Sequence, residues 1–274
     1  MQETNTLLSS IPQDLYMRLS HRTLSFARHE LRREPYFDYS VFHIQHRSSL
    51  RINLQEAVAT LPILQSPIRR IQILVDGGNP IPIPLADFNE EDCKKIYNYA
   101  VDNTENHEVF YDVIATAGIA LLFSVDKSVC KSIEDTFKTE VHYLSSLTPV
   151  LKHFTNRNVS TDQPLHVFLY LHESNMDVIL LNENRLIAVN SYFVQRETDV
   201  AYYTLGLLRN FVADIEETVV HIVADDAALR ESASTELKKY LSQIYTIHPA
   251  AEFNRHPIAV TEDITYDFIN LLLP

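Results

Sequence analysis

Glycine is scarce in this sequence, with 4 residues among 274. A globular chain of this length usually has roughly nineteen, because glycine makes up about 7% of ordinary sequences. Only a residue without a Cβ atom adopts positive φ at low cost and lets backbone amides close around a phosphate group. The composition therefore argues against most glycine-rich nucleotide-binding loops.

Tryptophan is absent, and the two cysteines, Cys93 and Cys130, are too far apart for a CxxC metal or redox motif. Such cysteine usage favours a reducing compartment. No apolar run is long enough for a membrane span. The first residues, MQETNTLLSSIPQ, lack the basic region and the continuous apolar core of a signal peptide. We therefore expect a cytoplasmic protein without membrane insertion.

Positive charge is also in short supply. The chain has 23 Lys and Arg residues against 36 Asp and Glu residues, which gives a formal net charge of −13. This charge repels nucleic acids and anionic lipids unless a local basic patch outweighs it. The one basic cluster, residues 28–33 (RHELRR), is diluted by Glu30. We expect no nucleic-acid partner.

What the sequence does contain is typical of two folded domains. Its length of 274 residues and its apolar share of 46% suit a globular protein of roughly two domains. Residues 1–12 are polar and end at Pro12, and a second polar stretch covers 156–164. We predict a flexible leader over 1–12, a first lobe over 13–158 and a second lobe over 159–274.

The first lobe opens with alternating patterns that predict an antiparallel meander of three strands. Asn53 precedes an amphipathic stretch and is expected to cap a helix over 54–64. Gly77 and Gly78 come before Asn79-Pro80, which predicts a hairpin turn and not a phosphate loop. The remaining expected elements are the strand 68–76, an extended segment over 81–88, a helix from about 89, two strands within 109–125, a helix over 127–137 capped by Asp126, the strand 141–147 and a helix over 149–156.

The second lobe begins in the same way. Its patterns predict three strands, then alternating helices and strands: 165–172, 176–181 and 185–194, the helix 197–214, the strand 218–224, the helix 228–244 and the strand 244–248. Apolar residues on both sides of the first of these strands favour a sheet that is covered on both faces. The duplicated order predicts an α/β protein built from two similar βββαβα units.

Duplicated βββαβα units of this length resemble the actin-like ATPase fold, a two-lobed member of the ribonuclease H-like class. Members of the pilus-assembly and cell-division kind have a phosphate loop, Asp-aliphatic-Gly-x-x-x-Thr-Asp, between their first two strands. In this frame Tyr170 stands at the Asp position and His172 at the Gly position, and the turn ends at Asn175, Met176 and Asp177.

The first-lobe hairpin, Arg18 to Ser25, also lacks Asp and Gly. The adenosine motif of these ATPases is a strand that ends in Gly-Gly before a helix. At the corresponding place this chain has Ala224, Asp225 and Asp226 instead. The resemblance therefore implies the fold, while the residues of its nucleotide chemistry are replaced.

The chain is also similar to an uncharacterised Bacteroidetes family of unknown function with an actin-like ATPase fold. The similarity is carried by Leu19-Ser20, by Leu24-Ser25-Phe26 and by the hairpin from Leu181 to Phe193. It covers residues 12–260. Because that family has no known function, it implies no catalytic residues.

Five residues are candidates for a cleft: Tyr170, His172, Asp177, Asp225 and Asp226. The two adjacent carboxylates could hold Mg²⁺ or one could cap the following helix, and we favour the cap. Asp177 could face a metal ion or serve the turn, and His172 could be a general base or a structural residue; we favour the structural interpretation for both.

Two histidines, His43 and His46, are the closest pair in the sequence, but residues three apart on a strand point to opposite faces. We assign no catalytic residue, no metal ligand and no cofactor.

The preferred hypothesis is a degenerate, non-catalytic actin-like protein that acts as a binding or scaffold module with a protein partner. The bulky Arg18, Tyr170 and His172 would crowd a triphosphate. The alternative is a divergent Mg-dependent ATPase or phosphotransferase that binds nucleotide in the interlobe cleft through Asp225, Asp226 and Asp177. A ribonuclease H-like nuclease ranks last, because it needs clustered acids that begin on the first strand. The oligomeric state is left open.

Overall fold

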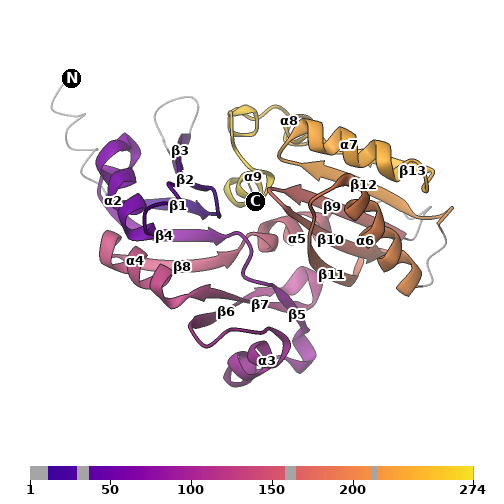
Figure 1. Cartoon of the computed structure of the whole chain (residues 1–274), viewed down its shortest axis with the longest axis horizontal. Helices are drawn as coiled ribbons and strands as arrows, with labels where there is room; N and C mark the ends of the chain where they lie inside the picture. The colour runs from indigo at the N-terminus through magenta and orange to yellow at the C-terminus, as the bar shows by residue number, and fades with distance from the viewer. Residues whose placement is uncertain (1–11, 30–36, 158–164, 212–214, 274) are drawn as a thin grey trace. The chain divides into compact units, whose positions relative to one another are not determined.

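A computed structural model describes residues 12–29, 37–157, 165–211 and 215–273 (Figure 1). Most of the expected leader and the polar stretch over 158–164 lie outside the described residues. The leader and the division between residues 158 and 159 stay predictions. By its internal packing the chain forms two compact units, the first over 1–79, 89–112 and 121–146 and the second over 80–88, 113–120 and 147–274.

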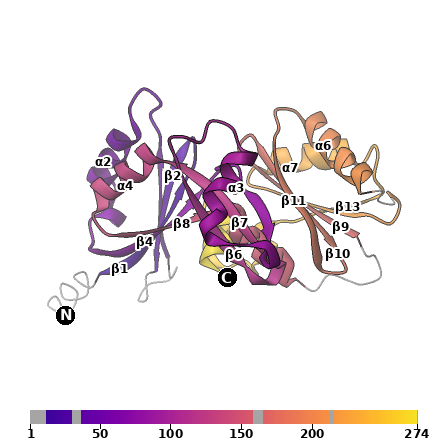
Figure 2. The same ribbon diagram turned by 90° about the horizontal axis from the view of Figure 1, so that it is seen from below.

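The first unit is built on a five-stranded sheet with the order β3-β2-β1-β4-β8. The strands are β1 (Gln13–Leu19), β2 (Thr23–His29), β3 (Phe37–His43), β4 (Ile68–Val75) and β8 (Glu140–Ser145). The first three form the expected antiparallel meander, and β4 and β8 add to it in parallel. Two neighbouring helices, α2 (Leu50–Thr60) and α4 (Lys127–Phe137), bury Leu54 and Ile133 against this sheet (Figures 1 and 2).

The second unit repeats this arrangement. Its sheet has the order β11-β10-β9-β12-β13. The strands are β9 (Leu165–His172), β10 (Asn175–Asn182), β11 (Arg185–Phe193), β12 (Val219–Ala224) and β13 (Gln243–Thr246). Helices α6 (Glu197–Asn210) and α7 (Ala227–Leu237) lie side by side along it (Figures 1 and 2). The predicted duplication of βββαβα units is therefore present.

The central strand β9 is covered on both faces. Val167 and Leu169 point to one face and join the apolar core with α6 and α7. The alternate residues face α5 (Leu147–Asn156) and α9 (Tyr266–Leu272), where Phe168 stacks on Phe154 with ring centroids 4.2 Å apart. This confirms the expectation drawn from the apolar pattern of the strand, since parallel strands are usually buried on both sides.

A third sheet, with the order β5-β7-β6, interrupts the first repeat between β4 and α4. Its strands are β5 (Ile81–Pro84), β6 (His107–Ile114) and β7 (Ile119–Asp126), and the segment also carries α3 (Cys93–Ala100). The short helices are η1 (Pro62–Leu64), η2 (Leu85–Asp87), η3 (Glu90–Asp92), η4 (Ala115–Ala117), α8 (Pro249–Glu252) and η5 (Pro257–Val260). None of the helices that the structure describes is long and apolar enough to cross a membrane.

Several helix boundaries differ from the expectation, among them the start of α3 and the end of α6, and two differences have a clear cause. Helix α2 begins after Ser49, whose side chain accepts a hydrogen bond from the Ile52 amide, so Asn53 is not its cap. Asn53 is buried inside the helix and binds both backbone groups of Gln45, a contact that a local pattern does not show. Helix α7 ends at Leu237 and not at 244, because residues 243–246 pair with β12 as β13.

Scarce glycine leaves tight turns to other residues. Among the described residues, Glu173, Glu183 and Asn184 have positive φ, and each lies in a hairpin turn of the second unit. Gly77 and Gly78 occupy the turn after β4 with φ of +85° and +71°. A Cβ atom at Gly78 would lie 2.8 Å from the Ser124 carbonyl oxygen, whereas one at Gly77 would meet nothing within 4 Å.

We predict that Gly78→Ala lowers the free energy of unfolding by about 1–3 kcal/mol more than Gly77→Ala does. Both substitutions put a Cβ atom at positive φ, which costs about 1–2 kcal/mol, but only the first also collides with backbone. Urea denaturation of the two variants beside the unchanged protein measures the difference. Equal losses would contradict the collision.

Candidate functional site

In each unit an aspartate directly follows the middle one of the three parallel strands, which is β4 in the first unit and β12 in the second. Asp76 comes after β4, and its amide donates a hydrogen bond to the Leu19 carbonyl at 2.9 Å. Asp225 comes after β12, and its amide donates to the Leu171 carbonyl at 3.2 Å. The two aspartates thus hold equivalent places at the carboxyl ends of parallel strands, where open α/β folds bind ligands.

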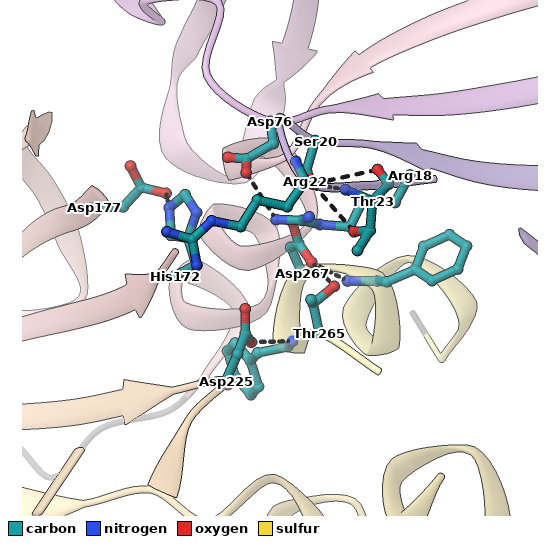
Figure 3. A network of polar contacts seen from close by, with 12 residues as sticks. Arg18, Ser20, Arg22, Thr23, Asp76, His172, Asp177, Asp225, Thr265 and Asp267 are labelled. Carbon is teal, nitrogen blue, oxygen red and sulfur yellow. Dashed lines mark hydrogen bonds and ion pairs between the residues drawn. The ribbon is translucent and has the colours of Figure 1, made fainter. Parts of the chain in front are cut away.

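In the first unit, Asp76 is paired with a buried arginine. Arg18 on β1 reaches it at 3.2 Å, and the two side chains are 1% and 3% exposed (Figure 3). Isolated charges in an apolar interior are very costly, so each of these side chains depends on the other for its charge. The pair occupies the strand end with protein atoms.

In the second unit, the equivalent strand position holds Tyr170 in place of arginine. The fully buried Tyr170 donates a hydrogen bond from its hydroxyl group to Asp225, and both carboxylate oxygens lie within 3.1 Å of the hydroxyl oxygen. Asp225 also accepts a hydrogen bond of 2.7 Å from the Tyr266 amide at the start of α9 (Figure 3). Asp225 itself stays exposed, unlike Asp76.

A second polar group lies beside Tyr170. His172, whose ring stacks on that of Tyr170, contacts Asp177 through Nε2 at 3.0 Å, and both side chains are buried. The Ser191 hydroxyl donates to the other oxygen of Asp177. In a Ser-His-Asp triad the histidine lies between the serine and the aspartate so that it can take the hydroxyl proton. Here the aspartate is central, so the arrangement orients a carboxylate and does not activate Ser191.

The last candidate, Asp226, caps helix α7. Its Oδ1 accepts hydrogen bonds from the Ala228 and Leu229 amides at 2.6 and 3.1 Å. This is the helix-cap interpretation that the sequence favoured. Asp226 and Asp225 therefore have separate tasks despite their adjacency.

Both hairpins that match the phosphate-loop frame are tight turns. His172 pairs with Asn175, so only two residues connect β9 and β10. In the first unit the Ser20 hydroxyl accepts hydrogen bonds from the Arg22 and Thr23 amides. These amides are bound by the turn itself, whereas a phosphate loop directs its amides to the ligand.

A pair of histidines lies further along the same face of the second sheet. His166 Nδ1 and His221 Nε2 are 3.1 Å apart, and His221 stacks on Phe168. Burial, then the charges of His166 and Arg157, lowers the pKa of His221 from 6.5 to about 4, although Glu252 opposes the shift. His221 is therefore neutral at physiological pH.

The basic cluster and the two cysteines do not form a site among the residues that the structure describes. Arg28, from the basic cluster, is buried and donates to the carbonyls of Ser66 and Pro67, and residues 30–33 lie outside the described residues. Cys93 and Cys130 are free and buried. Within the part of the chain that the structure describes, no three His, Cys, Asp or Glu side chains gather closely enough to hold a metal ion.

Sequence reasoning missed Asp76 and Ser191. An alignment of the strand ends IQILVD and VHIVAD places Asp76 on Asp225, so the repeat contains a signal for the first. Ser191 lies directly opposite Asp177 between β10 and β11, and only the register of that pair brings the two together.

Comparisons with known proteins agree with this architecture. A family model of proteins of unknown function, DUF3822, matches residues 2–244. A Bacteroides thetaiotaomicron protein with an actin-like ATPase fold and unknown function is 20% identical with a TM-score of 0.80, over 97% of this chain and 98% of that chain. A chain of the PilM-PilN type IV pilus biogenesis complex is 10% identical with a TM-score of 0.56, over 87% and 89% of the two chains. A comparison with curated proteins finds no match.

These findings confirm the actin-like ATPase fold and the resemblance to a family of unknown function. The low identities show the fold and nothing of the activity.

We predict that Tyr170→Phe lowers the free energy of unfolding by about 1–3 kcal/mol, because the buried strand end loses the hydroxyl that serves Asp225 and accepts from the Asp267 amide. Tyr202→Phe is the matched control, since Tyr202 lies in the same unit and is 73% exposed. Urea denaturation compares them. A Tyr170→Phe protein as stable as the control would show that the hydroxyl contributes nothing.

We also predict that stability falls as the pH drops from about 6.5 to about 4, the unfolded and folded pKa values of His221. Because the folded pKa is the lower one, the unfolded chain binds the proton more readily in this window, and up to about 3 kcal/mol is lost. His221→Asn should flatten the pH dependence measured by denaturation, whereas the exposed His142→Asn should not. An unchanged slope in the His221 variant would contradict the assignment.

Proposed function

Since the chain belongs to the DUF3822 family of proteins of unknown function and has the actin-like ATPase fold, we propose that it is a non-catalytic member of that fold. In this proposal it acts as a binding or scaffold module for another protein. It neither binds nor hydrolyses ATP.

The observation that carries the proposal is the repeated occupation of the strand ends by paired side chains. Arg18 and Tyr170 lie in the hairpins that match the phosphate loops of an actin-like ATPase. Each is paired with the aspartate that follows the neighbouring parallel strand, Asp76 and Asp225. A nucleotide phosphate would meet the carboxylates of Asp225 and Asp177 without a glycine-rich cradle of amides. The negative charges of these carboxylates repel a phosphate group, so the site opposes an anionic ligand.

A role in protein assembly is supported by the use of this fold elsewhere. A chain of the PilM-PilN complex shares the fold, and in that complex it is part of a protein assembly. An actin-like unit offers large surfaces outside its nucleotide site. A chain that has replaced its phosphate loops can keep these surfaces for a partner.

The alternative is a divergent Mg-dependent ATPase or phosphotransferase. The exposure of Asp225 and Asp226 favours it, since carboxylates that reach solvent can bind Mg²⁺ through its water ligands. The hydrogen bonds of these carboxylates argue against this alternative. One oxygen of Asp226 accepts from the α7 amides, and Asp225 accepts from the Tyr170 hydroxyl and the Tyr266 amide.

Isothermal titration of the full chain with Mg-ATP separates the two functions. We expect no saturable heat up to about 1 mM nucleotide, which corresponds to less than about 4 kcal/mol of binding free energy. Phosphate release should equal that of buffer, with a known actin-like ATPase as the positive control. Micromolar binding that is lost in Asp225→Asn would overturn the proposal and establish the alternative.

A further inference from the structure

Helix α3 presents an aromatic ring to solvent that the fold does not use. Tyr99 is 95% exposed, the highest exposure among the large apolar side chains of the described residues. It lies near the end of α3, and this helix belongs to the segment inserted between β4 and α4 of the first unit (Figure 1 shows α3). Tyrosine is enriched at protein interfaces, where its ring contacts the partner and its hydroxyl stays in water.

The opposite face of α3 explains how the helix is held without Tyr99. Cys93 and Tyr97 are buried, and the Tyr97 hydroxyl donates to the Gly78 carbonyl in the turn after β4. The outward side chains are therefore free to contact another molecule, and their substitution leaves the packing of the helix intact.

Tyr99 borders an open groove of about 770 Å³. Its lining residues are Asp92, Lys95, Ile96, Asn98, Tyr99 and Ala100. The groove thus combines an aromatic ring and an aliphatic side chain with polar residues, as ligand sites commonly do.

Carboxylates flank the groove at both ends of α3. The exposed acidic residues of segment 89–108 are Glu90, Glu91, Asp92, Asp102, Glu105 and Glu108, against Lys94 and Lys95 alone. This segment therefore has a net charge of −4, in a chain whose total is −13. A surface of this sign attracts cationic partners and repels anionic ones.

We propose that the α3 groove docks a basic segment of another protein, in which Arg or Lys stands beside an apolar side chain. The cationic group lies on the Tyr99 ring or against Asp92, and the apolar side chain contacts Ile96. A second copy of this chain is disfavoured because both surfaces would carry the same charge. The inference rests on the proposed role as a protein-binding module and names the chemistry of the partner.

Selection of random peptides displayed on phage against the immobilised full chain tests the inference. We expect enriched sequences that combine Arg or Lys with aromatic or aliphatic residues. The most enriched peptide, made synthetically with a fluorescent label, is then measured by fluorescence polarisation. Tyr99→Ser should weaken its binding about tenfold or more, as loss of a central aromatic contact does. Asp92→Asn with Asp102→Asn should weaken it as well, most strongly at low salt.

Tyr240→Ser is the matched control, because Tyr240 is an exposed tyrosine of the second unit. It should leave binding unchanged. Three outcomes would each overturn the proposal that the α3 groove docks a basic segment: enrichment of acidic or uncharged peptides, equal binding to the Tyr99→Ser protein, or no enrichment. If peptides bind the Tyr99→Ser protein equally well, the chain can still be a protein-binding module that uses a different surface. The proposed function itself is contradicted by a different result, the binding of Mg-ATP.

Discussion

The second unit depends on the burial of one strand on both of its faces. Residues 166–172 of β9 are all buried, between α6 and α7 on one side and α5 and α9 on the other. Polar groups in such a place need partners, since an unpaired buried group costs several kcal/mol. His166, Tyr170 and His172 each have a polar partner on a neighbouring strand or strand end: His221, Asp225 and Asp177. The polar network of this unit is therefore a consequence of its central strand.

The first unit meets the same constraint with different chemistry. Arg18 and Asp76 form a buried ion pair at the position where the second unit uses a phenol and a carboxylate. Charged pairs are stabilising only when both partners are present, whereas a phenol can be buried at lower cost. Two unlike solutions at one repeated position show what the position demands: a donor for the aspartate that follows the parallel strand.

Much of this could be predicted from local pattern. The succession of strands and helices along the chain, the duplication, the capping by Asp126 and the place of each candidate residue on a strand or turn follow from side-chain periodicity and from turn and cap residues. Helix ends were less secure: Asn53 is a good capping residue by type, yet its amide is taken by Gln45, and Ser49 caps the helix. Tyr170 and Asp225 could each be selected from the sequence, but their mutual contact could not, because 55 residues separate them.

By itself the sequence determined the α/β class, the twofold repeat and the absence of glycine from the first hairpin of each unit, because these depend on residue type and on short periods. Only the tertiary structure decided which donor serves which carboxylate. The parallel register of β9 with β12 sets Tyr170 beside Asp225, and the register of β10 with β11 sets Ser191 beside Asp177. A shift of one residue would turn each side chain to the opposite face. Such registers follow from packing between distant segments, which no local pattern contains.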